Sequence, residues 1–249
     1  MQKIIVGNLK MNMENIATRN AYCKELIAGS MKMTTKNTVV VCPPTIYVEY
    51  FCRALQNTPI RVGAQDCFWE LYGSFTGNTS PQAIHALGGR YVIVGHSERR
   101  EHNHETNEDI VKKIHGALRC ELTPIVCVGF LSHGDEMESI HNQISAIMEG
   151  LSATAMQKIM IAYEPVWAIG SGKTPTSDDI HTMVMYIRSL IAQHCGKEQS
   201  LTVPILYGGS VTPQNARALC VDAHTDGVLV GGASLAADRF MHIVRAISL

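Results

Sequence analysis

Short runs of apolar, mostly β-branched residues recur along the chain, with longer stretches of mixed polarity between them. Eight such runs are present, at residues 4–6, 39–41, 60–62, 91–94, 124–128, 159–162, 203–206 and 227–230. As a group they lack the apolar and polar alternation of a half-exposed strand, as expected of parallel strands that are covered on both faces. The pattern therefore predicts eight buried parallel strands.

Several of the intervening stretches combine helical periodicity with a helix-start signal. One apolar stripe follows Thr106-x-x-Asp109, a pair of the capping-box type. A second stripe follows Ser177 and has two aspartates in its first turn. Thr212 followed by Pro213 is typical of a cap with proline at the first helical position. The repeated alternation of a predicted strand and a predicted helix indicates βα units.

These units favour one closed (β/α)8 barrel, an α/β fold with a single domain over residues 1–249. No linker rich in glycine, serine or proline and no shift in composition divides the chain. The alternative is an open Rossmann-like sheet, whose first βα turn would read G-x-G-x-x-G. The chain reads GNLKMN at residues 7–12, so the dinucleotide-binding motif is missing there.

Composition and charge limit the classes of partner. The chain has 21 Lys and Arg against 22 Asp and Glu, a formal net charge of -1 that supplies no field for binding nucleic acid. No apolar run approaches the ~20 residues that span a bilayer, and no signal-peptide pattern begins the chain. The eight cysteines form no CxxC pair, which is typical of a reducing compartment. We expect a cytoplasmic protein that binds neither nucleic acid nor membranes.

Polar residues and glycines gather directly after the predicted strands. The C-terminal ends of barrel strands open on one mouth, where barrel enzymes place their active sites. The residues at these positions are Asn8, Lys10, Gln65, His96, Glu164, Ser210, Gly231 and Gly232. We expect them to form one site.

Three of these side chains suit proton transfer on an anionic substrate. Glu164 follows an apolar strand, where exclusion of water makes a carboxylate a useful base. His96 leads into an expected helix start, whose free N–H groups favour a neutral histidine that donates a hydrogen bond. Lys10 can hold an anion and stabilise developing negative charge. Each residue alone has an ordinary explanation: Glu164 as a carboxylate that caps a loop, His96 as a core histidine and Lys10 as a solvated lysine. The catalytic interpretation depends on the convergence of the three side chains at one site.

The glycines after the last two strands suggest phosphate binding. Gly208-Gly209 with Ser210, and Gly231-Gly232, can present backbone N–H groups to a phosphate, although glycine pairs also form plain turns. The segment 169–174 fails the P-loop pattern, because Trp167 stands where glycine is required, and it is interpreted as a lid that excludes water. No HExxH pattern or other metal-ligand spacing occurs, so no metal is expected.

The segment 67–80 is unusually aromatic for a loop. It holds Phe68, Trp69, Tyr72 and Phe75, and this is too much apolar surface for a solvated connection. We predict that it is buried against a second copy of the chain. The alternative is a loop folded back on its own barrel.

Five motifs, in order and spacing, closely resemble those of the triosephosphate isomerase family. They are GNLKMN at 7–12, VGHSERR at 94–100, AYEPVWAIG at 162–170, YGGSV at 207–211 and GGASL at 231–235. The resemblance runs from about residue 3 to the C-terminus. It implies a homodimeric barrel enzyme that interconverts dihydroxyacetone phosphate and D-glyceraldehyde 3-phosphate in glycolysis and gluconeogenesis, without cofactor or metal.

The resemblance also implies a role for each matching residue. Glu164 is the base that moves a proton between two substrate carbons, and His96 is the neutral group that polarises the carbonyl. The other catalytic residue is Lys10, and the substrate-binding set is Asn8, Lys10, Gly170, Ser210, Gly231 and Gly232. The supporting and dimer-contact set is Gln65, Thr76, Glu98 and Arg99, with Glu98 near Lys10 and Thr76 reaching the partner's active site. Asn78 replaces a glutamate that commonly pairs with the matching arginine across the interface, which predicts a weaker dimer than usual.

Two other functions fit a phosphate-binding barrel. The first is a different sugar-phosphate isomerase or an aldolase, but a Schiff-base aldolase needs a lysine on a central strand, where this chain has Glu164. The second is a catalytically silent scaffold that binds phosphate compounds. The presence of Lys10, His96 and Glu164 together argues against a silent scaffold.

Overall fold

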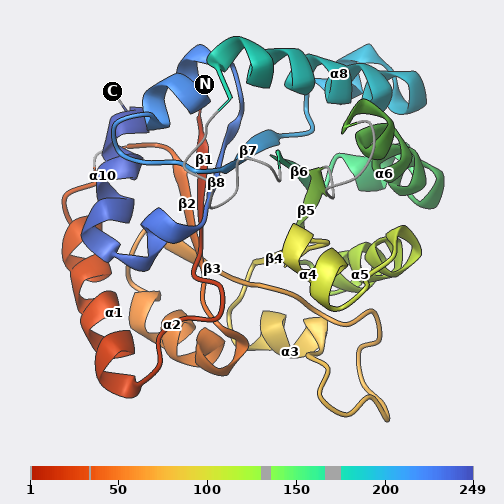
Figure 1. Ribbon diagram of the computed structural model, residues 1–249. Helices are drawn as coiled ribbons and strands as arrows, with labels where there is room; N and C mark the ends of the chain where they lie inside the picture. Colours follow the sequence, from red (N-terminus) through yellow and green to blue (C-terminus); the bar gives the residue numbers. More distant parts are fainter. Residues whose placement is uncertain (1, 34, 130–135, 166–174, 249) are drawn as a thin grey trace.

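The computed structural model describes residues 2–33, 35–129, 136–165 and 175–248. Their parallel strands form one closed barrel in chain order, because β1 pairs with β2 on one side and with β8 on the other (Figure 1). The strands are β1 Ile4–Asn8, β2 Thr38–Cys42, β3 Ile60–Ala64, β4 Tyr91–Val94, β5 Thr123–Gly129, β6 Met160–Glu164, β7 Ile205–Gly209 and β8 Gly227–Val230. The predicted (β/α)8 barrel is confirmed.

Helices surround the barrel and form the connections between its strands (Figure 1). The longer ones are α1 Ile16–Ser30, α2 Val48–Leu55, α5 Asn107–Arg119, α6 Glu136–Gly150, α8 Ser177–Cys195 and α10 Ala237–Ser248. The shorter ones are η1 Thr45–Tyr47, α3 Pro81–Ala86, α4 Ser97–His102, α7 Ala153–Met156, α9 Lys197–Ser200, η3 Ala218–Asp222 and η4 Gly232–Leu235. Among the helices described, none combines the length and apolarity that crossing a bilayer requires.

Two apolar layers pack on the two faces of the barrel sheet. Inside the barrel, strand residues such as Val6, Val40 and Ile125 form one cluster. The residues next to them in sequence, such as Ile5 and Val39, point outward and pack in a second cluster with the helices. Burial on both faces explains why the strand sequences do not alternate between apolar and polar positions.

Two predicted helix starts have the expected reciprocal cap. The Thr106 hydroxyl accepts the N–H of Asp109 at 3.2 Å, and the Asp109 carboxylate accepts the N–H of Thr106 at 3.1 Å. Helix α8 begins at Ser177, but its cap is the residue before, Thr176, which forms the same box with Asp179. A cap residue must have extended backbone, so the helix begins one residue after its cap.

The helix expected after Thr212 is short. Thr212 donates its N–H to Asn215 Oδ1 at 2.7 Å, and the Ala216 N–H bonds back to the Thr212 carbonyl at 2.9 Å, which makes one helical turn. The chain then widens into the π-helix η3. The predicted cap is therefore present, but it does not start a regular α-helix.

Six of the eight strands extend further toward their C-terminal ends than the apolar runs do, and β4 and β8 end where their runs end. β1 includes Asn8, and β6 ends on Glu164, which pairs with Gly129 at the end of β5. A Cβ on Gly129 would lie 1.9 Å from the Glu164 carbonyl oxygen, so only glycine lets the two strands approach here. Both polar residues are thus held by the sheet and not by loops.

Candidate active site

A cavity of about 360 Å³ opens at the C-terminal ends of the strands. It is lined by Asn8, Lys10, His96, Glu164, Gly208, Gly209, Ser210, Val211, Thr212, Leu229, Gly231, Gly232, Ala233 and Arg239. The structure thus brings together residues of β1, β6, β7 and β8 with His96, which follows β4, although they are far apart in the sequence. The location agrees with the mouth predicted for a barrel enzyme.

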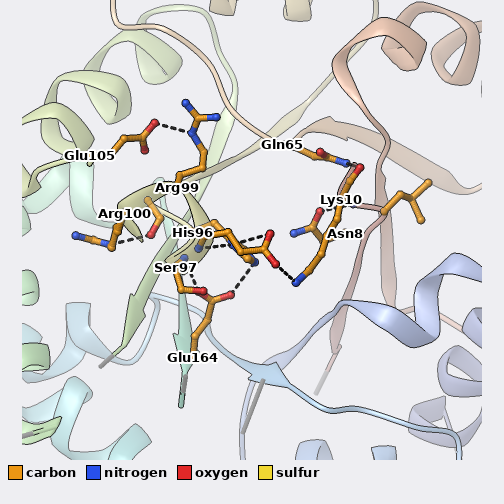
Figure 2. Close-up of polar contacts among 12 residues, drawn as sticks. Asn8, Lys10, Gln65, His96, Ser97, Arg99, Arg100, Glu105 and Glu164 are labelled. Atoms are coloured by element: carbon orange, nitrogen blue, oxygen red, sulfur yellow. Dashed lines mark hydrogen bonds and ion pairs between the residues drawn. The ribbon is translucent and has the colours of Figure 1, made fainter. Parts of the chain in front are cut away.

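The backbone at Lys10 is held in an unusual conformation by its neighbours. Lys10 has a φ of 48°, in the left-handed region that costs energy for a residue with a side chain. Its N–H donates to Asn8 Oδ1 at 3.0 Å, and its carbonyl accepts from Gln65 Nε2 at 2.9 Å (Figure 2). Gln65 Nε2 also donates to the carbonyl of Cys42 at 2.9 Å. Asn8 and Gln65 therefore fix the point from which the Lys10 side chain enters the cavity.

The Lys10 ammonium is paired with a carboxylate from α4. Lys10 Nζ lies 2.5 Å from Glu98 Oε1. Burial raises the pKa of Glu98, but the hydrogen bond and charge of Lys10 outweigh it and leave that pKa below its ordinary value. Glu98 is therefore ionised at neutral pH and holds the Lys10 ammonium at the cavity.

His96 is buried at the start of α4 and has a defined hydrogen-bond pattern. Its Nδ1 accepts the backbone N–H of Glu98 at 3.2 Å, so Nδ1 carries a lone pair and not a proton. In a neutral ring the proton is then on Nε2, which lies 3.2 Å from Glu164 Oε1 (Figure 2). The start of α4 thus presents an N–H donor, not a cation, to the cavity.

Helix α4 is anchored to the barrel behind His96. The Arg100 guanidinium donates to the Gly95 carbonyl at 2.9 Å, to Asn107 Oδ1 at 2.7 Å and to the Cys127 carbonyl at 3.3 Å. These bonds connect α4 to β5 and α5. They keep the imidazole of His96 at a fixed distance from β6.

Glu164 is the last residue of β6 and is only 3% exposed. One carboxylate oxygen faces His96, and the other, Oε2, accepts the N–H of Ser97 at 3.1 Å. A carboxylate with so little exposure to water can act as a base once a substrate that carries the proton replaces His96 and the Ser97 N–H as its contacts. The N–H of Ser97 belongs to the backbone, so no pattern of side chains could predict this contact.

The two glycines after β8 leave open space next to Lys10, whereas Gly208 and Gly209 belong to β7, where a Cβ would lie 3.0 Å from Glu164 or 2.3 Å from Tyr207. A Cβ on Gly232 would meet no atom within 4 Å, and one on Gly231 would lie 3.4 Å from the Cε atom of Lys10. Ser234 Oγ donates to the carbonyls of Asn8 and Gly231, which joins this turn to β1. Backbone N–H groups beside a cation suit an anionic group such as phosphate.

A second group of charges lies behind the cavity and was not predicted. Lys113 Nζ, 5% exposed, is 2.7 Å from Asp66 Oδ1 and 2.5 Å from Glu105 Oε1. Arg99 contacts the same two carboxylates at 3.0 and 2.5 Å. Burial raises the pKa of Asp66, and the charge of Lys113 counteracts this rise. The signal in the sequence was a lysine on the apolar face of α5, next to Ile114.

Not every predicted residue lines this cavity: Gln65 and Glu98 contact Lys10 from outside the lining, and Arg99 pairs with Asp66 and Glu105. Thr76 is exposed on the loop 67–80, which extends away from the barrel between β3 and α3 (Figure 1). Gly170 and the lid segment 169–174 lie outside the described residues. Among the residues that are described, no three His, Cys, Asp or Glu side chains are grouped so that they could hold a metal ion.

Comparison with known proteins identifies the family. The family model for triosephosphate isomerase matches residues 3–247. A triosephosphate isomerase of Lactobacillus delbrueckii subsp. lactis is 41% identical, with 97% of this chain and 96% of the relative covered. Those of Streptococcus mutans serotype c and Streptococcus pyogenes serotype M49 are 39% and 40% identical at the same coverage. With the barrel and the geometry of its mouth, this match shows that the chain belongs to the triosephosphate isomerase family.

Proposed function

We propose that the protein interconverts dihydroxyacetone phosphate and D-glyceraldehyde 3-phosphate through an enediolate, with no metal or cofactor. The observation that carries this proposal is the arrangement of His96, whose Nε2 lies 3.2 Å from the Glu164 carboxylate in a cavity shared with Lys10. A base, a neutral donor and a cation are the groups that proton abstraction beside a carbonyl requires. We further propose that this reaction serves glycolysis and gluconeogenesis and that the protein is cytoplasmic.

Glu164 is the proposed base. It takes the proton from the carbon beside the carbonyl, and the electron pair of that C–H bond moves to form the enediolate. The Nε2–H of His96 hydrogen-bonds to the carbonyl oxygen, and the Lys10 ammonium stabilises the negative charge that develops there. After a proton has moved between the two oxygens, Glu164 returns its proton to the neighbouring carbon.

Substrate must rearrange the contacts of the free site. Glu164 Oε1 now lies where His96 Nε2 would meet the substrate carbonyl. The carbonyl oxygen would replace that carboxylate oxygen, and Glu164 would give up the N–H of Ser97 and turn toward the substrate carbon. The N–H groups of Ser210, Gly231 and Gly232, with that of Gly170, are the proposed phosphate contacts.

A coupled assay that follows the conversion of D-glyceraldehyde 3-phosphate by the purified protein tests this proposal. We expect fast turnover, and tight binding of phosphoglycolate in a titration of the same sample. Binding without turnover would reject the proposal in favour of a silent phosphate-binding scaffold. Turnover of a different sugar phosphate alone would favour another isomerase.

We also propose that the chain forms a homodimer through the loop 67–80, with Thr76 entering the partner's active site. Phe68 stacks on Trp69 at 4.0 Å and contacts Phe75 at 4.8 Å, so the base of the loop has its own aromatic packing. Tyr72 is nevertheless 85% exposed and Phe75 41% exposed. Exposed aromatic rings on a projecting loop are typical of a surface that is buried in a partner.

We expect substitution of Asn78 by glutamate to strengthen this dimer. Arg99 keeps donors beyond its contacts with Asp66 and Glu105, and an added carboxylate on the partner's loop would attract it. The dissociation constant, measured by dilution in analytical ultracentrifugation, should fall about fivefold in Asn78→Glu. Asn78→Gln is the uncharged control. Equal constants for the two variants would contradict a charged contact at this position.

A further inference from the structure

Arg239 lies in the first turn of α10 and lines the same cavity as Lys10 and Glu164. It is outside the five sequence motifs that identify the site. Among the described lining residues, the side chains with a fixed positive charge are those of Lys10 and Arg239. The cavity therefore has a second cation that the motifs do not include.

The Arg239 guanidinium is available to a ligand. Within the described ranges it has neither an ion pair nor a side-chain hydrogen bond, and the residue is exposed. The neighbouring Asp238 carboxylate accepts the backbone N–H of Arg239 at 2.7 Å instead. Lys10, by contrast, is already paired with Glu98 at 2.5 Å. Arg239 thus keeps its five N–H donors for a group that enters from solvent.

The charges around the cavity show what Arg239 adds. Lys10 and Arg239 are positive, whereas Glu164 and Glu98 are negative, so the four charges cancel. Without Arg239, one positive charge would face two negative charges. A phosphate ester brings about two more negative charges at neutral pH. Arg239 therefore removes a repulsion that a triose phosphate would otherwise meet at the rim.

The connectivity places Arg239 on the side of the glycine turn. Gly231 and Gly232 follow β8, the short helix η4 starts at Gly232, and η4 packs against α10. The space above Gly232 is open, since a Cβ there would meet no atom within 4 Å. A guanidinium beside backbone N–H groups matches the geometry of phosphate oxygens, to which it can donate two parallel bonds.

We propose that Arg239 is a substrate-binding residue that recognises the phosphate group at the rim of the cavity and attracts triose phosphates into it. This inference rests on the proposed function for the identity of the substrate, but the phosphate site itself does not depend on turnover. Because the side chain is exposed, salt screens its attraction for the phosphate group.

The test compares Arg239→Gln with Arg245→Gln. Arg245 is exposed on the same helix and is outside the cavity, so the two variants lose the same charge from α10. We expect Arg239→Gln to raise KM for D-glyceraldehyde 3-phosphate about fivefold at low ionic strength, with kcat unchanged. The difference should shrink to less than about twofold at ~0.5 M salt. Arg245→Gln should match the parent protein.

Inorganic phosphate gives a readout that needs no catalysis. Its dissociation constant, measured by calorimetric titration, should rise about fivefold in Arg239→Gln and stay unchanged in Arg245→Gln. Equal KM values and equal phosphate affinities for the two variants would overturn the inference, as would a loss confined to kcat. A parent protein that does not turn over, but binds phosphate more tightly than Arg239→Gln, would reject the proposed function and support Arg239.

Discussion

Replacing Glu164 by aspartate is expected to lower kcat for the isomerisation by about 10²-fold or more, with KM changed little. The substitution keeps the carboxylate but withdraws it by one methylene from the end of β6. The base then lies about 1 Å too far from the substrate carbon, while Lys10 and the glycine turn still bind the phosphate group. Steady-state kinetics with D-glyceraldehyde 3-phosphate measures both constants.

Two further variants make this result specific. Glu164→Gln removes the base entirely, so its kcat should fall further, by about 10³ to 10⁴-fold. Glu149→Asp, at an exposed position of α6, makes the same chemical change away from the cavity and should leave kcat unchanged. A Glu164→Asp protein with kcat within about twofold of the parent would show that another group is the base.

The largest loss of stability is expected from Lys113→Met. The ammonium of Lys113 balances Asp66 and Glu105, and its removal leaves the half-buried carboxylate of Asp66 and the buried one of Glu105 sharing Arg99. One Glu105 oxygen, Oε2, is already buried and has no hydrogen-bond partner among the described residues. Breaking a buried ion-pair network typically costs about 3 kcal/mol of unfolding free energy or more. Urea denaturation at a fixed protein concentration measures this change.

The neighbouring lysine is a matched control. Lys112 is one residue away on the same helix and pairs with Glu108 at 2.7 Å, but both side chains are exposed. Exposed pairs of this kind contribute little, so Lys112→Met should unfold close to the parent midpoint. Similar destabilisation by Lys112→Met and Lys113→Met would contradict a special role for the buried ammonium.

The deficit of Lys113→Met, meaning its loss of unfolding free energy relative to the parent protein, should depend on pH. Burial raises the pKa of Asp66, and Lys113 opposes that rise, so the pKa in the folded variant should be higher still. A carboxyl whose folded pKa is raised binds its proton more readily when folded, so stability is lost as pH increases through that range. The deficit should therefore be smaller at about pH 5 than at about pH 8. Adding Asp66→Asn should recover part of it at the higher pH.

The sequence was sufficient to predict where Glu164, His96 and Lys10 lie, because each follows a buried strand and parallel strands end at a common edge. It could not predict which contacts they make. The contact of Glu164 with Ser97 uses a backbone N–H, and the tautomer of His96 depends on where the N–H of Glu98 points. Such contacts depend on the local path of α4, which no side-chain pattern encodes.

Residues that act through tertiary pairing were missed. Asp66 and Lys113 are 47 positions apart and come together only when the segment that follows β3 lies against α5. Arg239 follows no strand directly, so a search of strand ends passes over it. For Lys113 the sequence did carry a signal, because a lysine stands on the apolar face of a predicted helix. Nothing in the local sequence distinguished Arg239 from other exposed arginines.

Closure of the barrel joins the two ends of the chain in one cavity. Lys10 belongs to the first βα unit, and Gly231 lies beside its side chain after the last strand. During synthesis, nearly the whole chain must therefore leave the ribosome before both halves of the cavity exist. Until β8 pairs with β1, the growing sheet has two unpaired edges that can join other chains. Activity in a nascent or truncated chain would thus report completion of the last strand pair, and not the folding of the earlier units.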